Sequence, residues 1–204
     1  MFKPALFGAA LLAIASTQAL ACKGPNLQFS DDFTEIDEAW SPVNADMMKI
    51  DGGKLNLSSD VNKLNYVTYE GAFFPVGDAC VDITFPGASS RDAMQTAGGL
   101  IFGNTSWQDF YILMIRPDGY AWVSRLSKNS WLRPIPTKKF DAIKTGPNAV
   151  NQLRVKFTKT TAQAYINDKL FANLKIMSDE NAKVGFYVES EGSTWLFDNL
   201  KITD

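Results

Sequence analysis

Carboxylates are the side chains that could carry acid–base chemistry in this chain, because its 204 residues include no histidine. The absence of histidine excludes a serine–histidine–aspartate triad, an imidazole general base and a histidine-ligated zinc ion. Glu189 and Glu191 lie two residues apart after an apolar run, so they would face the same side of a strand. A carboxylate pair of this kind can cleave a glycosidic bond. Two solvated glutamates at a strand end are the alternative interpretation.

Aromatic and arginine side chains form a second candidate site, for binding rather than catalysis. Along VGFYVE (184–189), apolar residues alternate with Tyr187 and Glu189, which are expected to share the face opposite the core. Arg125 is costly to bury alone, so we expect it at an open surface or beside an acid such as Glu189. The predicted ligand-binding residues are Tyr111, Arg125, Tyr187 and Glu189. Of these, Tyr111 and Arg125 belong to a larger group in and around the hairpin at residues 110–126, which adds Trp107, Tyr120, Trp122, Trp131 and Arg133. Core packing is the alternative for each aromatic ring.

The elements that must position these residues are β-strands. Two aromatic, β-branched runs flank Pro117-Asp118-Gly119, a turn in which proline presets φ and glycine accepts a positive φ. Short runs separated by turn residues continue along the chain, and about a dozen strands of this kind require two packed antiparallel sheets. The segment 134–148 contains three prolines and is expected to be a long connection with one helical turn near Phe140.

The first 21 residues have the pattern of a cleaved signal peptide. Lys3 is followed by an apolar run over residues 5–15 and by the small-residue cleavage site Ala19-Leu20-Ala21. The apolar run is shorter than the roughly 20 residues that span a bilayer, so the protein is not expected to be transmembrane. Residues 22–204 are then expected to form a single domain in the periplasm or outside the cell.

The two cysteines, Cys22 and Cys80, both lie in the predicted mature chain. In an oxidising compartment they are expected to form a disulfide, which would stabilise the fold by about 4 kcal/mol in the chain-entropy account. Acylation of Cys22, as in a lipoprotein, is the alternative.

The net charge of the mature chain is 19 − 22 = −3, because cleavage removes Lys3 from the 20 basic residues. This small negative charge predicts no nucleic-acid partner.

The order of several short motifs resembles one superfamily over nearly the whole mature chain. These motifs are DDF (31–33), DGGKLNL (51–57), AGGLIFG (97–103), FYILMIRPDGY (110–120) and LFDNLKI (196–202). The sequence is similar to the concanavalin A-like lectin/glucanase superfamily, in particular to its laminin-G-like and 3-keto-disaccharide hydrolase-like domains. The resemblance implies an all-β, antiparallel jelly-roll β-sandwich whose first and last strands are adjacent.

The resemblance also implies two classes of function. The first is an exported carbohydrate-active domain that binds, and could hydrolyse, a glycan or glycoside, and any such enzyme would be a carboxylate-dependent glycoside hydrolase. The second is a non-catalytic structural or protein-interaction sandwich of the laminin-G type. No organic cofactor is expected, and a Ca²⁺ site involving Asp32 and Asp198 is the one metal site that the resemblance suggests.

Overall fold

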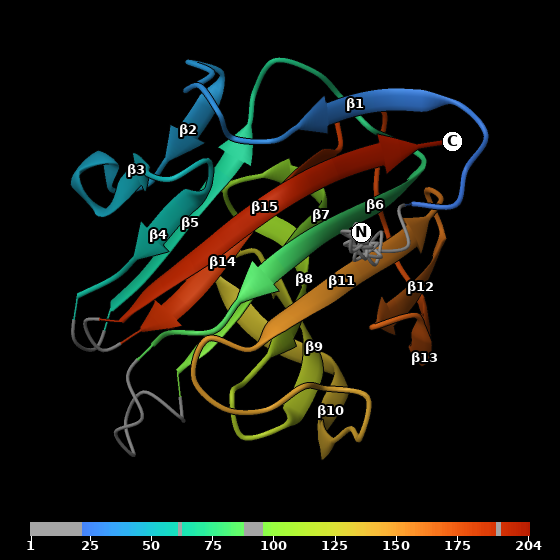
Figure 1. The fold of residues 1–204 in the computed structure, drawn as a ribbon. Coiled ribbons are helices and arrows are strands. Elements are labelled where there is room, and N and C mark those ends of the chain that lie inside the picture. Colours follow the sequence, from blue (N-terminus) through green and yellow to red (C-terminus); the bar gives the residue numbers. More distant parts are fainter. Residues whose placement is uncertain (1–21, 61–62, 88–95, 191–192) are drawn as a thin grey trace, which may run out of the picture.

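The structure is a computed structural model that describes residues 22–60, 63–87, 96–190 and 193–204. Its strands form two sheets packed face to face (Figure 1). Every pairing between described strands is antiparallel, which confirms the predicted all-β antiparallel sandwich. The predicted signal peptide (1–21) and Glu191 lie outside the described residues.

Sheet A contains the first and last strands. Its strands lie in the order β13 (Lys169–Lys175), β12 (Thr161–Ile166), β11 (Val150–Phe157), β6 (Gly77–Thr84), β15 (Thr194–Thr203), β4 (Leu55–Ser58) and β3 (Met48–Ile50). A 3₁₀ turn, η1 (Ala45–Met47), precedes β3. The first strand, β1 (Leu27–Asp31), pairs with the last strand, β15, as predicted.

Sheet B contains the hairpin predicted around Pro117-Asp118-Gly119. Its strands lie in the order β10 (Ser130–Lys139), β9 (Tyr120–Ser127), β8 (Asp109–Ile115), β7 (Ala97–Ser106), β14 (Lys183–Ser190), β5 (Lys63–Tyr69) and β2 (Trp40–Pro42). The predicted turn joins β8 to β9: Gly119 has φ +92°, and the amide of Arg116 donates to the carbonyl of Tyr120 at 2.9 Å.

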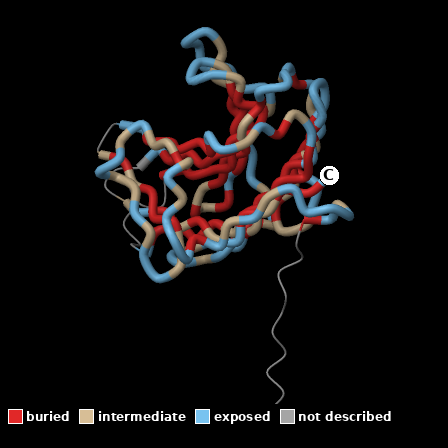
Figure 2. Tube along the Cα trace, turned by 90° about the horizontal axis from the view of Figure 1, so that it is seen from above, coloured by how far each residue is buried: buried red, intermediate tan, exposed pale blue. Residues whose placement is uncertain are grey.

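The main core fills the space between the sheets (Figure 2). Phe186 of β14 stacks on Phe197 of β15 at 4.4 Å, and Phe85 meets Trp195 edge-on at 5.4 Å. Val184 and Val188 are buried in the same core as Phe186, so the predicted alternation along β14 is confirmed. Tyr187 and Glu189 are therefore directed to the other face of sheet B.

The prediction of a long connection over 134–148 is wrong in its first part. Residues up to Lys139 belong to β10, which pairs with β9 despite Pro134 and Pro136. An edge strand tolerates proline because one side of its backbone needs no partner, and the register shifts on both sides of Ile135. Near Phe140 the chain makes a hydrogen-bonded turn, with the amide of Ile143 donating to the Phe140 carbonyl, in place of the expected helical turn.

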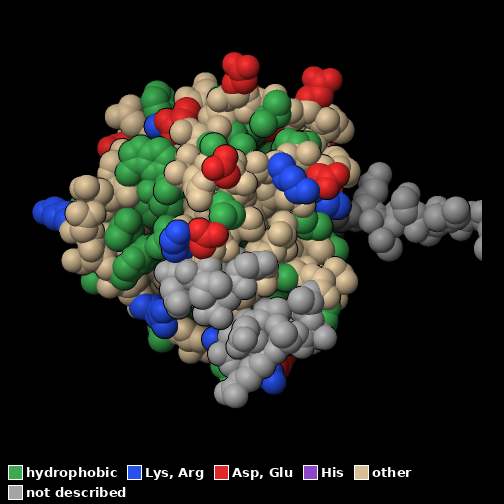
Figure 3. Space-filling model, turned by 90° about the vertical axis from the view of Figure 1, so that its left-hand side faces the viewer, with side chains coloured by type: hydrophobic (Ala, Val, Ile, Leu, Met, Phe, Trp, Pro, Cys, Tyr) green, Lys and Arg blue, Asp and Glu red, His purple; other side chains and the backbone are tan. Residues whose placement is uncertain are grey.

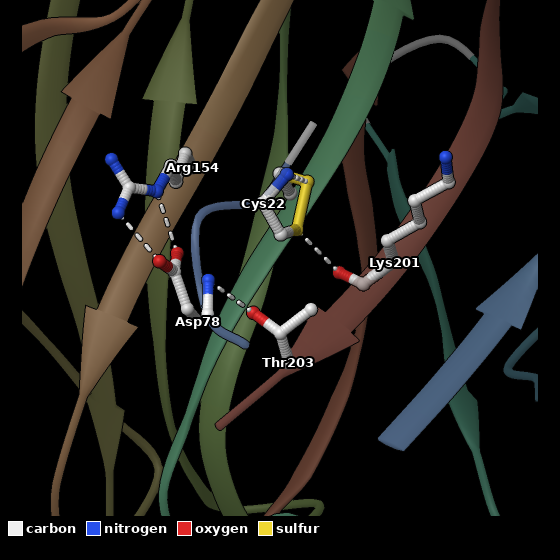
Figure 4. The surroundings of a disulfide bond; sticks show 7 residues. Cys22, Asp78, Arg154, Lys201 and Thr203 are labelled. Atoms are coloured by element: carbon white, nitrogen blue, oxygen red, sulfur yellow. Dashed lines mark hydrogen bonds and ion pairs between the residues drawn. A yellow bond between two sulfur atoms is a disulfide. The ribbon is translucent and has the colours of Figure 1, made fainter. Parts of the chain in front are cut away.

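The amino-terminal segment is tied to the outside of sheet A (Figure 4). Cys22 and Cys80 form the predicted disulfide, with their Cα atoms 5.6 Å apart. The amide of Gly24 donates to the hydroxyl of Thr203 at 3.0 Å. In the part of the chain that the structure describes, no helix is long and apolar enough to cross a membrane.

Candidate functional site

The face of sheet B that points away from the main core, named here the outer face, carries a second apolar cluster. Its buried members come from β5, β7, β8, β9 and β14: Tyr66, Ala97, Ile101, Phe110, Ile112, Met114, Trp122 and Tyr187. An antiparallel sheet needs one apolar face for packing, and its other face is commonly polar. A second apolar face therefore requires an explanation beyond the sandwich core.

Five aromatic side chains on this face touch one another and are named here the aromatic cluster: Tyr66, Trp107, Phe110, Trp131 and Tyr187. The ring of Tyr66 lies 5.1 Å from Trp107, 5.4 Å from Phe110 and 6.4 Å from Tyr187. The ring of Trp131 lies 6.0 Å from Phe110 and 5.8 Å from Tyr187. The contacts join residues from 66 to 187 in the sequence into one surface.

The contact between Trp131 and Tyr187 shows that sheet B is rolled toward its outer face. Trp131 lies on β10 and Tyr187 on β14, with β9, β8 and β7 between them. Neighbouring strands are about 4.8 Å apart, so a flat sheet would separate these two strands by about 19 Å. Their rings are nevertheless 5.8 Å apart. The outer face is therefore concave.

The aromatic cluster has a buried floor and two exposed rings. Tyr187 is 1% exposed, whereas Trp107 and Trp131 are each 46% exposed. Figure 3 shows hydrophobic side chains reaching the surface as a patch on one side of the molecule. Half-exposed tryptophans above a buried tyrosine floor provide flat apolar surfaces on which a ring-shaped ligand can stack.

Tyr187 and Glu189 add polar atoms at one end of the aromatic cluster. The Tyr187 hydroxyl donates to Oε1 of Glu189 at 3.1 Å, and the Glu189 side chain is exposed. Burial raises the pKa of Tyr187 well above its ordinary value, and the neighbouring carboxylate raises that pKa further. The hydroxyl therefore stays protonated and orients Glu189, whose remaining lone pairs can accept hydrogen bonds from a ligand.

The raised pKa of Tyr187 predicts a loss of stability in alkali. Above about pH 10 the unfolded chain loses the phenolic proton that folded Tyr187 keeps, so the free energy of unfolding falls as pH rises. We expect Tyr187→Phe to make this fall shallower by about 1.4 kcal/mol per pH unit. Urea unfolding of both proteins between about pH 10 and pH 11.5 measures the difference. Parallel curves for wild type and variant would contradict this account of Tyr187.

The structure does not bring the four predicted ligand-binding residues together. Tyr187 and Glu189 lie on the outer face, as expected, but Tyr111 is buried in the main core, where its hydroxyl accepts from the Met177 amide at 3.0 Å. Arg125 lies on the same side as Tyr111, with its guanidinium carbon 4.9 Å from the ring centre. The acid beside Arg125 is Asp109, at 3.1 Å, in place of the suggested Glu189.

The Ca²⁺ candidates have other partners. Asp198 forms an ion pair with Lys54. Asp32 accepts hydrogen bonds from the hydroxyl and amide of Thr34, at 2.9 and 3.1 Å, and these bonds lower the pKa of Asp32. Within the described ranges, no three acidic, cysteine or histidine side chains gather as a metal site. Calcium binding at Asp32 and Asp198 stays a prediction.

Sequence reasoning selected only one member of the aromatic cluster, Tyr187. Trp107 and Trp131 belong to the group predicted around the hairpin, but alternation within one strand does not say which face is concave, so the sequence does not distinguish them from core residues. Tyr66 alternates with buried Val67 along β5 and gave a usable signal, but its strand is far from the hairpin in sequence. Phe110 was missed because the run FYILMI (110–115) is apolar on both faces.

No protein-family model matches the sequence, and a comparison with curated proteins finds no match either. Solved structures do match. The carbohydrate-binding module CBM66 from Bacillus subtilis superposes with a TM-score of 0.65 at 15% identity, over 81% of this chain and 96% of the module. The fold is concanavalin A-like. This result confirms the jelly-roll sandwich that the motif order implied.

Two glycosidases share this concanavalin A-like fold. The laminarinase from Flavobacterium sp. UMI-01 gives a TM-score of 0.62 at 12% identity, over 88% of this chain and 100% of the enzyme. The laminarinase catalytic domain from Thermotoga maritima gives 0.64 at 10% identity, over 88% and 98%. At these identities the likeness establishes the fold, which serves both binding modules and hydrolases, and the activity must be argued from the site.

Proposed function

We propose that this protein binds a glycan in the concave outer face of sheet B. One observation carries the proposal: Trp107 and Trp131 are half-exposed, and they contact the buried rings of Tyr66 and Tyr187, respectively. Sugar rings present apolar C–H faces as well as hydroxyls, and binding sites commonly combine aromatic surfaces with a few placed polar groups. The concanavalin A-like neighbours, a carbohydrate-binding module and two laminarinases, support the same class of ligand.

The polar partner in this proposal is Glu189. Its carboxylate is exposed, and the Tyr187 hydroxyl holds it beside the aromatic cluster. A sugar stacked on Trp131 would have a hydroxyl within reach of this carboxylate, because the Trp131 ring contacts the Tyr187 ring at 5.8 Å. Stacking then supplies most of the binding free energy, and the hydrogen bond to Glu189 orients the sugar.

Binding, rather than hydrolysis, is the function that the described residues support. Glycosidases place two carboxylates about 5–10 Å apart across the scissile bond. Among the described side chains, Glu189 is the one carboxylate hydrogen-bonded to the aromatic cluster, and Glu191 lies outside the described residues. Hydrolysis by Glu189 and Glu191 stays a prediction.

Export to the periplasm or the medium is part of the proposal, supported by the pattern of residues 1–21.

Single replacements of the exposed tryptophans test glycan binding. We expect Trp107→Ala and Trp131→Ala each to weaken binding by about 1–3 kcal/mol, roughly a 5- to 150-fold rise in Kd. A glycan array identifies a ligand, and calorimetry then compares the variants. The control is Phe73→Ala, because Phe73 is a similarly exposed ring that contacts Lys183 outside the aromatic cluster.

Two results would contradict glycan binding on this face. The first is wild-type protein that binds no glycan on the array, especially if it captures a purified protein partner as a laminin-G-type module would. The second is a glycan whose Kd is the same for wild type, Trp107→Ala and Trp131→Ala. Melting temperatures within a few degrees of wild type would show that the variants are folded.

A further inference from the structure

The β9–β10 hairpin is the most basic part of an acidic protein. Residues 120–139 contain Arg125, Lys128, Arg133, Lys138 and Lys139 and no aspartate or glutamate, whereas the whole chain has a net charge of −2. The aromatic cluster receives Trp131 from this same hairpin. The charge of the hairpin therefore bears on what the outer face can bind.

Two of the five cations have partners on the core side of the hairpin. Arg125 is paired with Asp109 at 3.1 Å. The ammonium group of Lys138 donates to the carbonyl of Phe171 at 3.3 Å and lies 4.6 Å from the centre of that ring. Arg133, Lys128 and Lys139 form no ion pair with any carboxylate among the residues that the structure describes.

Arg133 lies on the outer face, two residues after the exposed Trp131 along β10. Its guanidinium carbon is 5.4 Å from the centre of the Trp122 ring, and Trp122 belongs to the second apolar cluster on the outer face. Its Nη1 donates to the hydroxyl of Thr137 at 3.1 Å. Stacking and this bond hold the planar group in place while its other N–H donors are open to solvent, because the side chain is exposed.

The spacing along β10 suits a glycan of more than one sugar residue. Trp131 and Arg133 are two residues apart on the same face, which separates their Cα atoms by about 7 Å along the strand. The guanidinium reaches further along β10 toward Thr137, so a glycan with one ring stacked on Trp131 would bring its next sugar residue to the guanidinium. Guanidinium groups bind carboxylates and sulfates with two parallel hydrogen bonds. At the other end of the aromatic cluster, Glu189 would repel an anion and accept from a neutral hydroxyl.

We propose that the glycan bound by this protein is anionic, with one sugar ring on Trp131 and a carboxylate or sulfate of the neighbouring sugar residue on Arg133. The inference rests on the proposed glycan binding and specifies its ligand class. Lys139 lies opposite Tyr120 across the hairpin, so it extends the positive charge of this face along the strand. A polymer with repeated negative charges is attracted over this length, and its affinity falls with added salt.

Matched polymers that differ only in charge test the ligand class. Wild type should bind polygalacturonate more tightly than the same polymer after its carboxyl groups are reduced to alcohols, or bind dextran sulfate more tightly than dextran. Whichever pair shows the difference identifies the anion as a carboxylate or a sulfate. We expect Arg133→Gln to raise the Kd for the charged polymer about tenfold or more and to leave the Kd for the neutral polymer within about twofold.

The control variant is Arg116→Gln. Arg116 also stacks on an exposed aromatic ring, that of Tyr120, with its guanidinium carbon 5.2 Å from the ring centre. Unlike Arg133, it is paired with a carboxylate, that of Asp118. The two variants remove the same charge, so a general electrostatic effect would appear in both. We expect Arg116→Gln to leave the Kd for the charged polymer within about twofold.

Three outcomes would overturn the anionic ligand. If charged and reduced polymers bind equally and Trp131→Ala weakens both, glycan binding stands and the anionic class fails. If no polymer binds while the array identifies a neutral glycan, the anionic class fails and glycan binding stands; if the array also finds no ligand, both proposals fail. If duplex DNA or phosphatidylglycerol vesicles bind as tightly as the charged glycan, with no effect of Trp131→Ala, the hairpin is a general polycation and not an anionic sugar site.

Discussion

Replacing Arg154 with alanine is expected to destabilise the fold by about 3–5 kcal/mol, because the change leaves Asp78 as a buried charge without a partner. Nε and Nη2 of Arg154 donate to the two carboxylate oxygens of Asp78 at 2.6 and 2.5 Å (Figure 4). Asp78 is 2% exposed. Urea unfolding at neutral pH measures the loss as a lower midpoint.

The cost of this variant comes from the unpaired charge more than from the bond itself. The hydrogen bonds with Asp78 raise the pKa of Arg154, and Tyr165 packs under its guanidinium at 4.7 Å. A paired buried charge roughly balances its own desolvation, so replacing both partners with apolar residues of similar size can be nearly neutral. We therefore expect the double variant Asp78→Leu/Arg154→Met to be more stable than Arg154→Ala alone.

A control pair separates burial from charge. Lys49 and Asp51 form an ion pair at 3.3 Å, and both side chains are 67% exposed. Lys49→Ala should change the free energy of unfolding by less than about 0.5 kcal/mol, because water screens an exposed pair. If Arg154→Ala costs no more than Lys49→Ala, the pair between Arg154 and Asp78 does not have the role assigned here.

The sequence was informative wherever one strand face is apolar and the other is polar. The alternation along β14 placed Tyr187 and Glu189 on the outer face, and the structure confirms that placement. The Pro117-Asp118-Gly119 turn and the pairing of the two cysteines were equally predictable, because each depends on local chemistry or on a choice with few alternatives.

Prediction failed where both faces of a strand are apolar. In the run 110–115 of β8, every residue is hydrophobic, so the sequence does not say whether Phe110 or Tyr111 faces the core. The structure places Phe110 on the outer face and Tyr111 in the main core. Arg125 follows Tyr111 to the core side, because the two residues are directly paired between β8 and β9.

The aromatic cluster was beyond sequence reasoning for a different reason. Trp131 and Tyr66 are 65 residues apart, and they share a surface only because sheet B rolls toward its outer face. Curvature of this kind arises from the twist and coiling of the whole sheet and from bulges such as those around Ile135. No single strand contains that information, so a concave site appears only when the sheet is assembled.

Removing the disulfide is the second change with a large expected effect. The bond closes a segment with a sequence separation of 58 residues. Its loss increases the entropy of the unfolded chain, and for a loop of this size the expected destabilisation is about 4 kcal/mol. The double variant Cys22→Ala/Cys80→Ala avoids new buried hydroxyls, and its unfolding midpoint in urea is compared with that of the oxidised wild type.

The effect should be larger than that of any other tie in the amino-terminal segment, because the disulfide is its covalent link to β6. Asn26 donates to the carboxylate of Asp204 at 2.8 Å, and this bond is exposed. Asn26→Ala should therefore cost about 1 kcal/mol or less. Wild type treated with a reductant should unfold at the same urea concentration as the double variant, since both lack the same bond. A double variant as stable as the oxidised wild type would show that β1 and its pairing with β15 hold this segment without the disulfide.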